Sequence, residues 1–296
     1  MRFIYMENYW LEKKKGLKEN GYTVIESLLP ENLCDDSIDA ICEYMQMDFH
    51  DRATWYKKIP LNSSGSVPMH HHPAFWAVRQ HPAIYHAFAT LLEESKLWVT
   101  MDRAAVKVPC RYDLPQYGND KNKMHWDYDV RTLKAPCYQG LIYLVDTEKE
   151  QGAFGCIPKI YKKIVNKQID DNSFFDRSEV NGLFLEDVCH FEESEIERIS
   201  APKGSLIIFD SRLPHGNVCT HHNQSRFVQF ITMYKADSKE HVPALLYQTK
   251  QQRIECYQQS RPPEWLRGWN GQLDPEPHSP YPLSDLGKKL VGIDSW

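Results

Sequence analysis

A mainly β protein with flanking helices, arranged as a sandwich or a jelly roll, is the fold that three observations predict. From residue 96 onward, short β-rich segments follow one another at 97–108, 137–146, 205–209 and 227–234. Residues 141–145 are apolar at every position, which is typical of a strand covered on both faces. The first 95 residues instead carry the patterns of helices. We therefore expect a β core that rests on N-terminal helices.

The N-terminal region, residues 1–95, is expected to form a helical support. Residues 1–20 have a polar helical pattern, and residues 21–26 are predicted to form a strand that follows a glycine. A helix is predicted over 30–47, because its apolar residues recur on one face. A second helical region, 74–94, should break near Pro82, since proline lacks the amide hydrogen and its ring clashes with the preceding turn.

The whole chain, residues 1–296, is expected to be a single domain. Its β core would span 96–235 and carry a polar, irregular insertion at 159–203. A loop of that length near an active site is often a lid or substrate loop. The proline-rich extension 236–296 should wrap the core, because prolines fix φ and remove donors from a strand ladder.

Composition narrows the class of protein. With 35 basic and 40 acidic residues the net charge is −5, so nucleic acid is not expected as a partner. The eight cysteines form no C-x-x-C pair, which argues against structural zinc and favours free thiols. Neither a signal peptide nor an apolar run of ~20 residues is found, so we expect no membrane contact and a cytoplasmic location. The oligomeric state stays open between monomer and homodimer.

The most informative motif is the triplet His125-Trp126-Asp127. Residues at i and i+2 of a strand point to the same face, so His125 and Asp127 can reach one ion while Trp126 faces away. His215 follows the apolar strand predicted at 205–209 and supplies a second imidazole. Two imidazoles and one carboxylate form the facial triad of non-heme Fe(II) oxygenases.

Arg226 lies eleven residues after His215, which leaves room for a turn and a return strand. A guanidinium at that point could hold a carboxylate through two parallel hydrogen bonds. Taken singly, an H-x-D triplet is more often part of a solvated strand, and His215 and Arg226 are more often turn and surface residues. The combination, in order and at strand boundaries, favours the metal site.

The chain resembles the phytanoyl-CoA dioxygenase family of Fe(II)/2-oxoglutarate oxygenases. The likeness rests on the triplet, on segments 139–146 and 150–158, and on Pro214-His215-Gly216-Asn217 followed by Arg226. It covers about residues 97–234. The fold that this resemblance implies is the double-stranded β-helix, a cupin-like jelly roll.

The resemblance also implies roles for individual residues. His125, Asp127 and His215 would be the catalytic residues that ligate Fe(II), and Arg226 would bind the distal carboxylate of the co-substrate 2-oxoglutarate. Asn217 stands where the family often has a small hydroxyl residue, and its amide can still donate a hydrogen bond. Lys107 resembles a family lysine that meets co-substrate or substrate, although a strand lysine is more often a surface residue.

The implied reaction consumes O₂ and 2-oxoglutarate, releases succinate and CO₂, and by default hydroxylates a C–H bond of a small organic metabolite or acyl substrate. Halogenation is disfavoured because Asp127 is retained. Two alternatives stay open: a cupin-like metal-binding protein without oxygenase activity, and a metal-dependent isomerase or hydrolase. The substrate itself is undetermined, because nothing in the sequence distinguishes an acyl-CoA from a small metabolite. The absence of a basic cluster beside the triplet disfavours a CoA pyrophosphate, although Arg103, Lys107 and Arg131 could supply one.

The run His70-His71-His72 is a separate candidate for metal binding. Three consecutive histidines cannot all face one ion with good geometry, and Pro73 marks a helix start. We therefore expect a cap or a substrate-facing loop here.

Overall fold

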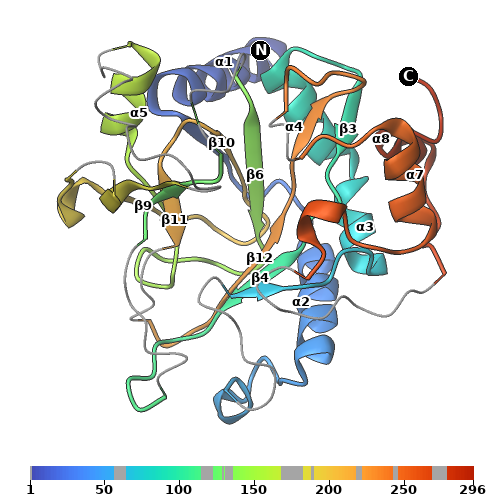
Figure 1. The fold of residues 1–296 in the computed structure, drawn as a ribbon. Coiled ribbons are helices and arrows are strands. Elements are labelled where there is room, and N and C mark those ends of the chain that lie inside the picture. Colours follow the sequence, from blue (N-terminus) through green and yellow to red (C-terminus); the bar gives the residue numbers. More distant parts are fainter. Residues whose placement is uncertain are drawn as a thin grey trace.

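The computed structural model describes residues 2–56, 65–114, 123–128, 130, 136–167, 183–187, 190–217, 222–242, 246–268 and 279–296. Within these residues two antiparallel sheets form the centre of the molecule, and helices flank them (Figure 1). This arrangement confirms the predicted mainly β class. No helix of the described residues combines the length and apolar character needed to cross a bilayer.

The larger sheet has six strands in the order β1-β10-β6-β12-β4-β2. In chain order these strands are β1 (Tyr22–Ile25), β2 (Ser66–Val67), β4 (Ala104–Lys107), β6 (Tyr138–Tyr143), β10 (Leu206–Asp210) and β12 (Arg226–Phe230). Every residue of β10 is buried, as its uninterrupted apolar run requires. This strand therefore lies in the core and not at the surface.

The smaller sheet has five strands in the order β8-β5-β11-β7-β9. These are β5 (His125–Trp126), β7 (Phe154–Cys156), β8 (Leu183–Phe184), β9 (Glu197–Ile199) and β11 (His215–Asn217). A separate two-stranded ribbon joins β3 (Leu97–Val99) to β13 (Met233–Lys235). Each strand of the smaller sheet is two or three residues long, so ladder pairing and not a long sequence pattern defines it.

The helices of the N-terminal region match the prediction. They are α1 (Arg2–Asn20), α2 (Glu31–Met45), α3 (Pro73–Arg79) and α4 (Pro82–Leu92). The break before Pro82 is confirmed, and His81 caps the new helix by accepting a hydrogen bond from the Ala83 amide. Figure 1 shows α1 and α4 near one end of β6 and α2 near β4 and β12.

Residues 159–203 are more regular than the sequence predicted. Helix α5 (Pro158–Val165) opens the segment, and two 3₁₀ turns follow at η4 (Leu185–Asp187) and η5 (Glu193–Glu195). Strands β8 and β9 are both edge strands of the smaller sheet, paired with β5 and β7. The prediction of an irregular insertion was wrong for these parts, because very short strands gain their stability from partners distant in sequence. Residues 168–182 and 188–189 lie outside the described residues.

The C-terminal part is likewise more helical than expected. It contains α7 (Lys250–Gln258), the 3₁₀ turn η6 (Glu264–Leu266) and α8 (Asp285–Val291). Another 3₁₀ turn, η1 (Arg52–Thr54), belongs to the N-terminal region. Buried Arg253 donates hydrogen bonds to the carbonyls of Leu290 and Val291 and to the Tyr234 hydroxyl. These bonds fasten both helices to β13. Residues 269–278 of the predicted proline-rich extension lie outside the described residues.

Candidate metal centre

Strand pairing brings the predicted ligands together. In the smaller sheet His215 is the register partner of His125, and Asp127 follows β5 directly. Directly opposed residues of an antiparallel pair point to the same face, so the two imidazoles are neighbours. Their ring centroids are 4.9 Å apart. This one pair of opposed strand residues thus brings together two histidines that lie 90 positions apart in the sequence.

The three side chains converge on a common point. His215 Nε2 lies 3.2 Å from Asp127 Oδ2, and His125 Nε2 lies 3.5 Å from Asp127 Oδ1. One ligand atom from each of the three residues can be chosen so that all lie within 4.8 Å of one another. That spacing matches donors placed around one ion at ligand distances of about 2 Å.

Each imidazole is oriented by its own backbone. His125 Nδ1 lies 3.1 Å from the Lys123 carbonyl oxygen, and His215 Nδ1 lies 3.0 Å from that of Leu213. A carbonyl can only accept, so Nδ1 carries a proton in each ring. Nε2 carries the second proton of a charged imidazole toward Asp127, and presents its lone pair when a metal ion displaces that proton and leaves the Nδ1–H form. This is the tautomer that a metal ligand needs.

The carboxylate has an outer partner as well. Gln139 of β6 donates from Nε2 to Asp127 Oδ2 over 3.0 Å, and so links the larger sheet to the site. Burial opposes ionisation of Asp127, but the positive charge of His215 and hydrogen bonds from both histidines hold its pKa well below the ordinary value. In the same way, burial opposes the charged form of His125, while the bond to Asp127 raises its pKa. Asp127 is therefore ionised, and its negative charge favours the binding of a cation.

Aromatic rings enclose the histidines. The ring of Phe209 lies 4.5 Å from that of His215, and Phe154 stacks on the same imidazole at 5.7 Å. Phe184 meets His125 edge-on at 6.2 Å. These contacts limit rotation of the imidazoles and keep one side of the site apolar.

A cavity of about 210 Å³ opens beside the three side chains. Both sheets contribute to its wall, together with the loop before β4 and the turn η6. The described lining residues are Ser66, Asp102, Arg103, His125, Asp127, Tyr128, Gln139, Gly140, Leu141, Phe154, Phe209, His215, Gly216, Asn217, Phe230, Thr232 and Trp265.

Arg226 lies behind the cavity wall and reaches it through Asn217. Its side chain is fully buried, and Nη1 donates to Asn217 Oδ1 over 2.7 Å. Its Nε and Nη2 atoms are buried and have no hydrogen-bond partner among the described residues. Burial lowers the pKa of this guanidinium to about 10, which still leaves it charged near neutral pH. Buried donors without an acceptor indicate a place for an anionic ligand.

Lys107 ends β4 directly opposite Arg226 in the ladder. Opposed residues share a face, so both side chains point to the same side of the larger sheet. Lys107 is half-buried and is not among the described residues that line the cavity.

The aromatic residues of β5 and β6, and Tyr128 after β5, occupy different places. Trp126 faces away from the site as predicted, is fully buried, and donates from its indole N–H to the Arg212 carbonyl. Tyr128 lines the cavity, whereas Tyr143 is a core residue whose hydroxyl donates to the Ile199 carbonyl. Tyr138 is a half-buried residue of β6 that packs against the core. Arg131 lies outside the described residues.

The histidine run serves the structure. His72 caps α3 as predicted, since its Nδ1 accepts from the Ala74 amide. His70 and His71 are both buried and meet the backbone carbonyls of Met101 and Arg261. Each ring thus holds a different backbone segment in place. Among the described residues, the three histidines do not form a group that could hold one metal ion.

Several site residues could not be found from the sequence. Gln139, Ser66, Asp102, Thr232 and Trp265 come from segments far apart and meet only through sheet packing. Gln139 alone carried a signal, because it lies two residues before the buried Leu141 in β6 and so points to the same face of the strand.

The fold and the site together define a jelly-roll protein with two histidines and one carboxylate on one sheet, the donor set that suits non-heme iron. The family model for phytanoyl-CoA dioxygenase (PhyH) matches residues 17–228. The chain therefore belongs to the phytanoyl-CoA dioxygenase family.

Individual relatives agree with this membership. A Dictyostelium discoideum protein named "Putative phytanoyl-CoA dioxygenase" is 21% identical over 321 residues, covering 93% of this chain and 84% of its own. The structure of GIG2 from Candida albicans superposes with a TM-score of 0.66 at 15% identity, over 96% of this chain and 76% of that one. The epimerase SnoN, crystallised with Fe³⁺ and α-ketoglutarate, gives a TM-score of 0.52 at 11% identity, over 78% and 85%. At these identities the structures show a shared fold.

Proposed function

We propose that this protein is an Fe(II)- and 2-oxoglutarate-dependent dioxygenase that hydroxylates a C–H bond of a small organic substrate and releases succinate and CO₂. The observation that carries the proposal is the convergence of His125, Asp127 and His215 within 4.8 Å beside a cavity. Membership of the phytanoyl-CoA dioxygenase family supports it.

The donor set fits iron. Two neutral imidazoles and a carboxylate would hold Fe(II) on one side and leave the facing coordination positions to co-substrate and O₂. When bound, the iron would supply O₂ activation, with 2-oxoglutarate as the second reductant. The protein's own contribution is to fix both Nε2 atoms through backbone carbonyls and the carboxylate through Gln139.

Arg226 and Asn217 fit the distal carboxylate of 2-oxoglutarate. Nε and Nη2 of Arg226 are buried donors without an acceptor, and a carboxylate would satisfy both. The amide oxygen of Asn217 is taken by Arg226, so its NH₂ group is left to donate toward the cavity that it lines. Lys107 would add positive charge at this end, because it shares a sheet face with Arg226.

Anaerobic spectroscopy tests the proposal. Fe(II) with 2-oxoglutarate should give a weak visible charge-transfer band that Arg226→Ala greatly weakens, while Arg52→Ala, a change at an exposed arginine, leaves it intact. Folded, iron-loaded protein that shows no band would favour a metal-binding protein or an isomerase. With substrates found by succinate release, incorporation of ¹⁸O from O₂ into product separates hydroxylation from other oxidative outcomes.

A further inference from the structure

A carboxylate that the proposed function does not use lines the cavity beside the metal ligands. Asp102 lies just before β4 and shares the cavity wall with His125 and Asp127. Only 16% of its side chain is exposed. A carboxylate in this position would face whatever molecule occupies the cavity next to the iron.

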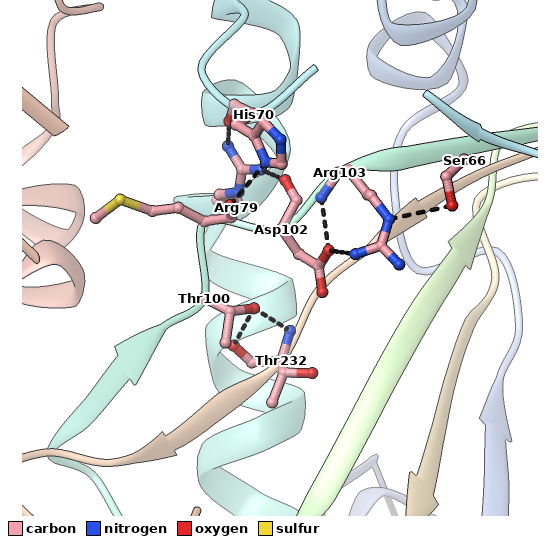
Figure 2. Close-up of polar contacts among 8 residues, drawn as sticks. Ser66, His70, Arg79, Thr100, Asp102, Arg103 and Thr232 are labelled. Carbon is pink, nitrogen blue, oxygen red and sulfur yellow. Dashed lines mark hydrogen bonds and ion pairs between the residues drawn. The ribbon is translucent and has the colours of Figure 1, made fainter. Parts of the chain in front are cut away.

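Hydrogen bonds from Arg103 fix one oxygen of this carboxylate. Asp102 Oδ1 accepts from the main-chain N–H of Arg103 over 2.7 Å and from its Nη1 over 3.1 Å. Nε of the same guanidinium donates to Ser66 Oγ over 3.2 Å, so the arginine is itself held in place (Figure 2). The Asp102 carboxylate therefore has a defined orientation.

The backbone at Asp102 is fixed as well. The fully buried Arg79 donates to the main-chain carbonyls of His70 and Asp102 (Figure 2). Two residues before Asp102, the main-chain N–H of Thr100 donates to the Thr232 carbonyl over 2.8 Å, and the N–H of Thr232 donates to the Thr100 hydroxyl over 3.1 Å. A side chain held in this way loses little entropy when it binds a ligand.

The second oxygen of Asp102, Oδ2, has no hydrogen-bond partner in the described part of the chain, and no dashed line reaches it in Figure 2. A carboxylate oxygen that is mostly buried is costly to leave without a donor. Because Asp102 lines the cavity, that donor must come from the contents of the cavity. A substrate that displaces water from this place has to replace the hydrogen bond that the water made.

The pairing of Asp102 with Arg103 indicates which kind of donor is missing. Burial raises the pKa of Asp102, whereas the charge and the main-chain N–H of Arg103 lower it and so favour the ionised form. The negative charge of the carboxylate is thus already matched by a guanidinium. What Oδ2 lacks is a hydrogen bond and not a cation, and a hydroxyl group is the smallest neutral donor that an organic molecule can offer.

We propose that Asp102 is a specificity-determining residue whose Oδ2 accepts a hydrogen bond from a hydroxyl group of the organic substrate. This inference rests on the function proposed above, since it concerns the substrate of that same site. The remainder of the molecule would lie against the apolar side chains of Leu141, Phe230 and Trp265, which line the same cavity. The substrate class is thus an alcohol with an apolar body.

Matched alcohols, ethers and amines test the proposal. Protein loaded with Mn(II) and saturated with 2-oxoglutarate is titrated calorimetrically with 2-phenylethanol, 3-phenylpropan-1-ol and octan-1-ol. Each alcohol is compared with its methyl ether, which has no donor, and with the corresponding primary amine, which is a cation at neutral pH. At least one alcohol should bind about ten-fold or more tightly than its ether, as for a hydrogen bond to a charged group, and more tightly than its amine.

Asp102→Asn is the decisive variant. Arg103 offers only donors to this side chain, so the amide oxygen must face Arg103 and the NH₂ group must face the cavity. That group can donate to an alcohol and to an ether alike, and the preference for the alcohol should disappear. Asp36→Asn, at an exposed position, should retain the preference.

Alcohols that bind no better than their ethers, with absence of binding counted as such, contradict the proposal. A preference that survives Asp102→Asn contradicts it too, because the extra methyl group of the ether would then explain the difference. Tighter binding of an amine than of its alcohol would show that the site takes a cation and would overturn the assignment of a hydroxyl group.

A crystal structure keeps the proposal testable if Asp102→Asn fails to fold. In wild-type crystals with Mn(II), 2-oxoglutarate and the preferred alcohol, the hydroxyl oxygen should lie about 2.5–3.0 Å from Asp102 Oδ2, and a hydroxyl placed elsewhere would contradict the proposal. Affinities for Mn(II) and 2-oxoglutarate are measured on the calorimetry samples. Their absence in wild-type protein would remove the proposed function, while unchanged values in Asp102→Asn show that only the substrate contact was altered.

Discussion

Asn217 accepts a hydrogen bond from Arg226 at 2.7 Å, and this single contact determines which way the amide faces. A guanidinium has only donors, so the Asn217 oxygen must point to Arg226 and its NH₂ group away from it. Because Asn217 lines the cavity, its NH₂ group can donate a hydrogen bond to a ligand there, next to the buried guanidinium of Arg226.

Changing Asn217 should therefore affect 2-oxoglutarate and spare the metal. Asn217→Asp keeps the acceptor for Arg226 but replaces the donor with a negative charge, so 2-oxoglutarate affinity should fall by about 100-fold or more. Asn217→Ser retains a hydroxyl donor and should lose much less. Calorimetry on Mn(II)-loaded protein measures both affinities. An Asp variant that binds 2-oxoglutarate like wild type would mean that this end of the cavity does not hold the co-substrate.

Gln139 is expected to tune metal affinity from the neighbouring sheet. Gln139→Leu removes the donor to Asp127 Oδ2, and loss of such an outer partner typically weakens metal binding about 10- to 100-fold. Gln251→Leu, an exposed change on α7, serves as the control. Mn(II) titration followed by electron paramagnetic resonance gives the affinities. Equal affinities in the two variants would show that Asp127 needs no support from β6.

Gly216 should tolerate no side chain. A Cβ added there would lie 2.4 Å from the Lys123 carbonyl oxygen and 2.9 Å from Met124 Cε, between the strands that carry the histidines. Gly216→Ala should cost about 1–3 kcal/mol of unfolding free energy and weaken metal binding. At Gly16 in α1 the nearest atom would be 3.5 Å away, so Gly16→Ala should stabilise the protein by about 0.5–1 kcal/mol. Urea denaturation tests both; a stable, metal-binding Gly216→Ala protein would contradict the close packing.

His70 should make stability fall in mild acid. The folded protein keeps this buried ring neutral, but the unfolded chain takes up a proton below about pH 6.5, so stability is present above that pH and is lost as the pH falls. The free energy of unfolding falls by about 1.4 kcal/mol for each pH unit below about 6.5. His70→Asn, which keeps a donor for the Met101 carbonyl, should lose less stability between pH 7.5 and 5.5 than wild type, whereas exposed His50→Asn should follow wild type. Identical pH slopes for wild type and His70→Asn would refute a neutral His70.

Much of the fold was predictable because its signals are local. Prolines 73 and 82 mark helix starts, the apolar run of β10 marks a buried strand, and the spacing of His125 and Asp127 places both on one face. These features depend on periods of two or 3.6 residues. The same local spacing predicted that His125 and Asp127 lie together in the proposed metal site.

The remaining features depend on contacts that no local pattern records. β8 and β9 are too short for a pattern, and Arg103, Gln139 and Trp265 meet only in the folded cavity. Helix α7 is an instructive exception. Thr249 and Gln252 form a reciprocal capping box, a sequence signal that precedes a polar helix, yet prolines nearby favoured the extended prediction.

In the proposed function, His125, Asp127 and His215 together hold one iron. Anomalous diffraction at the iron edge, from crystals grown anaerobically with Fe(II), locates that ion. We expect one strong peak about 2.0–2.2 Å from Nε2 of both histidines and from a carboxylate oxygen of Asp127. Iron bound elsewhere, or bound without one of these three side chains, would contradict it.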